Sequence, residues 1–136
     1  MSEPLNGLVV LDLTRLLPGP LCSLYLADFG ARVIKIEDRI GGDPLRHMPH
    51  LFNLLNRNKE SLALNLKDET DLKSFYELVK TADIVIESFR PNVPQKLKID
   101  YETLKKINPK IIYCSITGYG QTGPMKDQAG TTNYMA

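Results

Sequence analysis

Short apolar runs alternate with helical patterns along this chain, and the alternation predicts its fold. The runs are rich in leucine, isoleucine and valine, which is typical of buried strands. Five of them are predicted to be strands: Leu8–Leu13, Arg32–Glu37, Ser61–Leu66, Asp83–Glu87 and Ile111–Ile116. Because the connection between the first two is short and helical, these strands should be parallel, with a right-handed crossover.

Helical spacing of apolar residues marks the segments between the runs. A helix from Pro20 to the stop at Gly30 is predicted by Leu21, Leu24, Tyr25 and Phe29. Asp68 is predicted to cap a second helix, whose apolar stripe is Leu72, Phe75, Leu78 and Val79.

Shorter helical segments complete the pattern. Asp100 is predicted to cap a helix that contains Leu104 and Ile107 and ends at Asn108–Pro109. One helical turn is expected over Phe52–Asn56, and Pro91 with Pro94 brackets a loop or a helix start. Strands that alternate with helices predict an α/β fold with a mainly parallel sheet and helices on both faces.

The composition fits one domain and excludes several classes of function. The chain has 136 residues, and 17 basic against 16 acidic residues leave a net charge of +1. This balance argues against nucleic-acid binding and against attraction to a membrane surface. No apolar run approaches 18 residues and no secretory leader is recognisable, so a soluble, cytoplasmic protein is predicted. Cys22 and Cys114 match no metal or redox spacing and are predicted to be reduced, small apolar residues.

The first loop argues against a dinucleotide. Thr14–Pro20 contains two prolines and a single glycine, where a pyrophosphate-binding loop needs several glycines and their backbone N–H groups. Glu37 stands where a ribose-binding acid would follow the second strand, but without the glycines this match carries little weight. NAD(P) binding is therefore rejected.

Basic residues near strand ends suggest a different anionic ligand. Six of them are predicted to lie at or near strand boundaries: Lys35, Arg39, Arg57, Lys59, Lys67 and Arg90. In a parallel sheet, those past the carboxyl ends of the strands share one rim, where arginine is suited to bidentate phosphate binding. Arg90, between a buried strand and Pro91, is the strongest single candidate; the alternative is that all six are solvated surface charges.

Residues for proton transfer or nucleophilic chemistry are not evident. His47 and His50, the two histidines, lie in a loop rich in glycine and proline and are interpreted as surface residues. We find no pair of bases for proton transfer at carbon, no Ser/His/Asp set and no metal cluster in the sequence.

Several motifs together resemble the N-terminal part of the family III CoA-transferases. They are Leu5-x-Gly7-Leu-x-Val10-Leu-Asp-Leu, Pro18-Gly-Pro20, Leu26-Ala-Asp-Phe-Gly-Ala31, Val33-Ile-Lys-Ile-Glu37, Arg57-Asn-Lys, Ala82-Asp-Ile-Val-Ile-Glu-Ser-Phe-Arg-Pro91 and Asn108-Pro. The tail, Ser115-Ile-Thr-Gly-Tyr-Gly-Gln-Thr-Gly-Pro124 with Ala129-Gly130 and Asn133-Tyr134, looks most like the α-methylacyl-CoA racemase branch. The resemblance covers essentially the whole chain. It implies a Rossmann-like sheet that is the first part of a larger fold, so that residues 1–136 form a single, partial CoA-binding domain.

The resemblance also implies a ligand, a CoA thioester bound as substrate, and no tightly bound cofactor. By the family pattern, the ligand contacts fall on Leu17, Pro18, Arg39, Leu64, Asn65, Leu66, Lys67, Ser88, Phe89, Arg90, Pro91, Asn92, Gly130, Asn133 and Tyr134. One position departs from the pattern: the family arginine after the second strand aligns with Asp38, so that Arg39 must serve one residue later.

The catalytic residues of the family are missing from the matching positions. The racemase histidine position is occupied by Thr131 or Thr132, whose hydroxyl is too weak a base to remove a proton beside a thioester. The family's catalytic aspartate, which the transferases use as nucleophile, would lie beyond Ala136. We therefore expect no catalytic residue in this chain, and no activity from the chain alone.

Three functions follow as alternatives from the resemblance. The preferred one is α-proton exchange on an acyl-CoA by a racemase; the others are transfer of CoA between carboxylic acids, and a non-catalytic CoA-binding or assembly module. Family members have a second domain and form interlocked homodimers, so a partial domain should expose apolar surface and self-associate.

Overall fold

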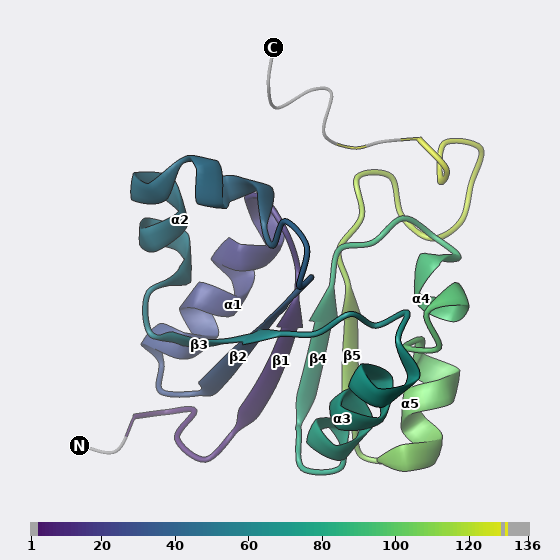
Figure 1. Cartoon of the computed structure of the whole chain (residues 1–136), viewed down its shortest axis with the longest axis horizontal. Coiled ribbons are helices and arrows are strands. Elements are labelled where there is room, and N and C mark those ends of the chain that lie inside the picture. Colours follow the sequence, from purple (N-terminus) through teal and green to yellow (C-terminus); the bar gives the residue numbers. More distant parts are fainter. Residues whose placement is uncertain (1–2, 129, 131–136) are drawn as a thin grey trace.

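The computed structural model describes residues 3–128 and residue 130, and its centre is a five-stranded parallel sheet. The strands are β1 (Val9–Leu13), β2 (Arg32–Glu37), β3 (Lys59–Ala63), β4 (Ile84–Glu87) and β5 (Ile112–Ser115). They lie in the order β3-β2-β1-β4-β5, and every neighbouring pair is parallel (Figure 1). The predicted α/β fold with a parallel sheet is confirmed.

Two groups of helices accompany the two halves of the sheet (Figure 1). The first half carries α1 (Pro18–Asp28), the 3-10 helix η1 (Pro44–His47) and α2 (Pro49–Asn56). The second half carries α3 (Glu69–Val79), α4 (Val93–Lys96) and α5 (Tyr101–Ile107). Both predicted caps are confirmed, because Asp68 accepts hydrogen bonds from Thr70 and Asp71, and Asp100 accepts one from Thr103.

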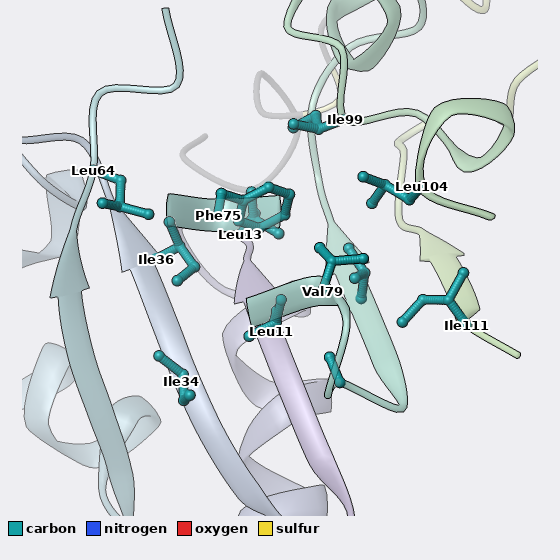
Figure 2. Packing of buried hydrophobic residues seen from close by; sticks show 12 residues of the cluster. Leu11, Leu13, Ile34, Ile36, Leu64, Phe75, Val79, Ile99, Leu104 and Ile111 are labelled. Atoms are coloured by element: carbon teal, nitrogen blue, oxygen red, sulfur yellow. The ribbon is translucent and has the colours of Figure 1, made fainter. Parts of the chain in front are cut away.

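Alternating strand residues fill two cores on opposite faces of the sheet. Leu11 and Ile34 point into the larger core, which Phe75 and Val79 of α3 close (Figure 2). Their strand neighbours Val10 and Val33 belong to the smaller core with Ala27 and Ala31, on the α1 side. This period of two places helices on both faces, as predicted.

The apolar stripe predicted for α1 is wrong in two of its four positions. Tyr25 and Phe29 are 56% and 54% exposed, whereas the small residues Gly19, Ser23 and Ala27 face the sheet. A side chain at Gly19 would collide with Thr14. The spacing of large apolar residues predicted the wrong buried face because this helix packs closely over a buried polar cluster, where small residues are needed.

The third strand begins two residues earlier than predicted and ends before Leu64. Its register with β2 runs from Val33 opposite Lys59 to Glu37 opposite Ala63. The leucines at 64 and 66 therefore lie past the strand end rather than within it. The helical turn expected over Phe52–Asn56 is part of α2, which begins at Pro49.

Candidate functional site

A cleft of about 300 Å³ lies at the carboxyl ends of the strands. The direction of the strand order reverses between β1 and β4, and the crevice at such a point is where open α/β sheets bind ligands. The cleft is lined by Leu13, Arg15, Ile36, Glu37, Asp38, Leu64, Asn65, Leu66, Lys67, Phe89, Val93 and Leu97. Apolar walls with a few charged groups suit a ligand that combines a flat ring with anionic groups.

Five of the residues predicted from the resemblance line this cleft: Leu64, Asn65, Leu66, Lys67 and Phe89. The four consecutive ones form the turn after β3. That turn is tied down because the Asn65 amide donates to Asp71 Oδ2 at 2.8 Å and the Lys67 amide donates to Asn65 Oδ1 at 3.1 Å. Their contact with a ligand stays a prediction, but the structure brings them together.

Other predicted residues are not among those that line the cleft. Leu17 and Pro18 lie at the exposed start of α1. Ser88 accepts a hydrogen bond from the Arg15 amide at 3.1 Å. The turn that follows Phe89 comprises Arg90, which is exposed, Pro91 and Asn92, which precedes α4 with a φ of 69°.

The tail is only partly described. A Cβ built on Gly118 would lie 2.5 Å from the Cα of Gly130, so these two backbones meet at a distance that only glycine permits. The predicted contacts Asn133 and Tyr134, and the threonines Thr131 and Thr132 at the family's histidine position, lie outside the described residues.

Arg39, the arginine expected from the resemblance to contact the ligand after the second strand, is paired with an aspartate. Arg39 Nη2 donates to Asp71 Oδ1 at 2.6 Å, while 58% of the arginine side chain remains exposed. Asp38, at the position where the family has arginine, lines the cleft instead. Arg39 therefore ties the loop after β2 to the start of α3, and its contact with a ligand stays a prediction.

Two of the six basic residues predicted near strand boundaries are buried in ion pairs. Lys59 Nζ lies 3.2 Å from Asp12 Oδ2 and also donates to the Pro20 carbonyl and to Ser23 Oγ, each at 2.8 Å. Lys35 Nζ lies 2.9 Å from Asp43 Oδ2. Neither lysine is a surface charge, because each is paired with an aspartate in the interior.

Arg15 is a cleft residue that the sequence analysis did not single out. Its guanidinium lies 5.8 Å from the centre of the ring of Phe89, which follows β4. The available signal was its place, two residues after a buried strand, which is the criterion that selected the other basic residues. Arg15 and Lys67 supply the two cationic side chains among the lining residues.

Glu37 ends β2 in a fully satisfied ionic environment. It accepts hydrogen bonds from Arg46 Nε and Nη2 at 2.7 Å, from the Asp43 amide at 3.1 Å and from Ser61 Oγ at 2.9 Å. Burial alone would raise the pKa of Glu37, but the bonds from Arg46, Asp43 and Ser61 outweigh it and lower the pKa to about 2. Glu37 is thus a structural anion and poorly suited to accept a proton.

Glu87 ends β4 in an apolar environment. It is fully buried, and its carboxyl accepts the Phe89 amide at 2.7 Å. Burial raises the pKa of Glu87 more than the bonds from Ser115 and Phe89 lower it. Within residues 3–128 and 130, Glu87 Oε1 and the Tyr113 hydroxyl have no hydrogen-bond partner.

In the described part of the chain, no cluster of His, Cys, Asp and Glu side chains could hold a metal ion. No helix there has both the length and the apolar character that crossing a bilayer requires. Cys22 and Cys114 are free thiols.

Comparison with known proteins identifies what the chain is similar to. The sequence model of the family described as CoA-transferase family III matches residues 5–136. An acetyl-CoA:oxalate CoA-transferase of Acetobacter aceti is 49% identical over 129 residues, which are 90% of this chain and 33% of that protein. A succinyl-CoA:glutarate CoA-transferase of Mus musculus is 44% identical over 136 residues, which are 94% of this chain and 31% of that protein.

Solved structures agree with this match. The crystal structure of a CAIB/BAIF family protein from Brucella suis superposes with a TM-score of 0.91 at 41% identity and covers 96% of this chain and 37% of that one. The chain thus spans about a third of the length of the curated relatives that it matches.

Proposed function

Because the chain belongs to CoA-transferase family III, we propose that its cleft binds the nucleotide part of a CoA thioester within a CoA-transferase. The observation that carries the proposal is the cleft itself, which places Arg15 and Lys67 beside the apolar walls of Leu64, Leu66 and Phe89. The apolar walls suit an adenine ring, and the two cations suit its phosphates.

The relatives favour the transferase over the racemase that the tail resembles. The matched proteins of Acetobacter aceti and Mus musculus are named as CoA-transferases, for acetyl-CoA with oxalate and for succinyl-CoA with glutarate. The alternative inferred from the sequence thus fits better than the preferred one. The substrate we propose is an acyl-CoA, with a carboxylic acid as the acceptor of CoA.

Binding, not chemistry, is the role we assign to the described residues. Of the two carboxylates at the cleft, Glu37 is held as an anion by Arg46, and Asp38 Oδ1 accepts the Ile40 amide at 2.9 Å. A transferase nucleophile must be free to attack the thioester carbonyl, and ion pairing of Glu37 makes it a weak candidate.

Isothermal titration of the chain with CoA tests the proposal. We expect saturable binding that Arg15→Ala and Lys67→Ala each weaken by about tenfold, because each removes one charged contact. Lys110→Ala is the matched control, since this exposed lysine precedes β5 at the opposite edge of the sheet. Absence of binding, or equal loss in the control, would overturn the proposal.

A further inference from the structure

The loop between β1 and α1 is held in a conformation that its sequence disfavours. Leu16 has a φ of 64°, in the left-handed region that a leucine rarely adopts. Such a residue persists only where its surroundings hold it. The neighbouring Arg15 lines the cleft, so the geometry of this loop decides where one of the two cleft cations lies.

Side chains from separate elements satisfy the backbone of this loop. The Thr14 amide donates to Asp12 Oδ1 at 2.9 Å, and the Arg15 amide donates to Ser88 Oγ at 3.1 Å. The Thr14 carbonyl accepts from Lys35 Nζ at 3.0 Å. The Leu16 amide faces Asp43 Oδ1 at 3.5 Å, a long contact to a charged group.

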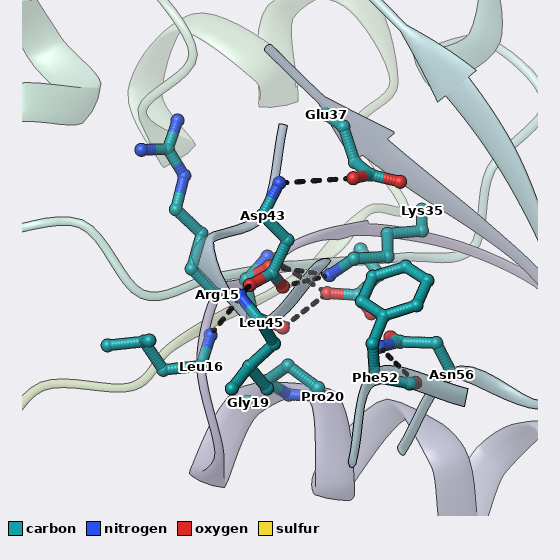
Figure 3. Close-up of polar contacts among 12 residues, drawn as sticks. Arg15, Leu16, Gly19, Pro20, Lys35, Glu37, Asp43, Leu45, Phe52 and Asn56 are labelled. Atoms are coloured by element: carbon teal, nitrogen blue, oxygen red, sulfur yellow. Dashed lines mark hydrogen bonds and ion pairs between the residues drawn. The ribbon is translucent and has the colours of Figure 1, made fainter. Parts of the chain in front are cut away.

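Asp43 takes part in two of these four contacts: it faces the Leu16 amide directly, and it pairs with Lys35, which donates to the Thr14 carbonyl. It is 1% exposed, and its Oδ2 lies 2.9 Å from Lys35 Nζ, whose side chain is 2% exposed. Its Oδ1 also accepts the Leu45 amide at 2.9 Å, and its own amide donates to Glu37 Oε2 at 3.1 Å. Figure 3 shows the Asp43 carboxylate and the Lys35 ammonium facing each other beside the loop, with the Arg15 guanidinium pointing away from them.

We propose that Asp43 and Lys35 are positioning residues of the cleft, which hold residues 14–17 so that Arg15 is presented to the ligand. A buried ion pair contributes little to stability relative to an apolar pair, and its best-attested benefit is a unique local structure. Here that structure is the left-handed turn at Leu16. The inference rests on the proposed function for its ligand, but the order of the loop can be measured without any ligand.

Amide hydrogen exchange of the 136-residue chain, followed by NMR without ligand, is the first test. In Asp43→Asn, which keeps size and the Oδ1 acceptor but removes the charge facing Lys35, the Arg15 and Leu16 amides should exchange about tenfold faster or more. Asp100→Ala is the control, because it removes the α5 cap far from the loop and should leave those two amides unchanged. Unchanged exchange in Asp43→Asn would overturn the proposal.

A double-mutant cycle of CoA affinity is the second test. Asp43→Asn should weaken CoA binding by about tenfold in the wild-type background and should have no further effect in an Arg15→Ala background, because it acts through Arg15. If the losses of CoA binding free energy are additive in the double variant, Asp43 acts independently of Arg15 and the positioning role is wrong. Should Asp43→Asn unfold, Lys35→Met with Asp43→Asn avoids an unpaired buried ammonium and is expected to give the same two results.

The outcomes separate this inference from the proposed function. If the wild-type chain does not bind CoA, the proposed function fails, while faster exchange at Arg15 and Leu16 would still support the role of Asp43 in holding the loop. If CoA binds and both Asp43 tests are negative, the proposed function stands and the positioning role is wrong.

Discussion

Glu37 and Glu87 are glutamates at equivalent places in the two halves of the sheet, yet their pKa values shift in opposite directions. Each is the last residue of its strand, β2 or β4, and both are buried at the carboxyl edge that forms the cleft. The pKa of Glu37 is lowered to about 2, whereas that of Glu87 is raised. Burial pushes both upward, so the difference comes from the partners.

Each half of the molecule is organised around a different kind of interior. The half with β2, β3 and α2 holds two buried lysines, both paired with aspartates. On the side of β4, helices α3 and α5 close the large apolar core, to which β1 and β2 contribute Leu11 and Ile34. Beside this core lies the Tyr113 hydroxyl, whose pKa is raised by burial and by Glu87. The cleft therefore has one wall fixed by ions and another fixed by packing, and the two should respond differently to pH and mutation.

The half with β2, β3 and α2 is here called the ionic half. The largest loss of stability is expected when a buried charge is removed from it. Lys59→Met removes the ammonium that joins Asp12, Ser23 and the Pro20 carbonyl, and leaves Asp12 buried without its cation. We expect the free energy of unfolding to fall by about 3–5 kcal/mol, measured by urea denaturation.

The double variant Lys59→Met with Asp12→Asn separates charge from packing. Removing both charges leaves no unpaired ion, so a substantial part of the loss should be recovered. If the single and double variants have equal free energies of unfolding, Lys59 stabilises the protein through packing and not through its charge. The proposed contrast between an ionic and an apolar half would then be wrong.

Glu37→Gln should give the next largest effect, and one that depends on pH. The folded-state pKa of about 2 lies below the ordinary value of 4.5, so the carboxylate contributes stability above pH 4.5 that is lost as the pH falls toward 2. At pH 7 the variant should be less stable by up to about 3 kcal/mol, and the difference should shrink steadily below pH 4.5. Thermal unfolding across this range measures it; a difference that is independent of pH would contradict the assignment.

Glu87→Gln should change stability in the opposite direction and by less. The folded-state pKa lies above 4.5, so the stability contributed by the neutral carboxyl is complete below pH 4.5 and is lost as the pH rises through the folded-state pKa. Glutamine keeps an acceptor for the Phe89 amide and cannot ionise. The variant should match the wild type in stability at pH 4 and be more stable than the wild type at pH 7. A less stable variant at pH 7 would mean that Glu87 is ionised and paired.

Local rules predicted much of the fold from the sequence. The β-branched run Arg32–Glu37 is a strand with the predicted bounds, and Asp68 and Asp100 cap helices as predicted. These features depend on near neighbours in the chain, where propensity and capping chemistry operate. The turn at residues 64–67 was placed on the site through resemblance, and its position at the cleft follows from the strand order.

Contacts between distant segments could not be predicted. Lys35 lies within a strand and Asp43 in a later loop, so no spacing rule shows that their charges neutralise each other in the interior. The exposed Tyr25 and Phe29 on α1 have the same origin, because the polar cluster of Asp12 and Ser23 determines which side of the helix faces the sheet. The role of Arg15 in the cleft was likewise not predicted, because it depends on contact with Phe89, which is distant in the sequence.

The smallest effect is expected from an exposed ion pair on the surface of the ionic half. Arg32 and Glu60 join β2 to β3 through two hydrogen bonds of 2.7 and 3.0 Å, but their side chains are 60% and 55% exposed. Water screens such a pair and its ordering costs entropy, so the urea midpoint of Arg32→Ala should match that of the wild type within error. Since the pair has the same chemistry as the buried pairs of this half, a loss approaching that of Lys59→Met would show that pairing itself, and not burial, makes the half ionic.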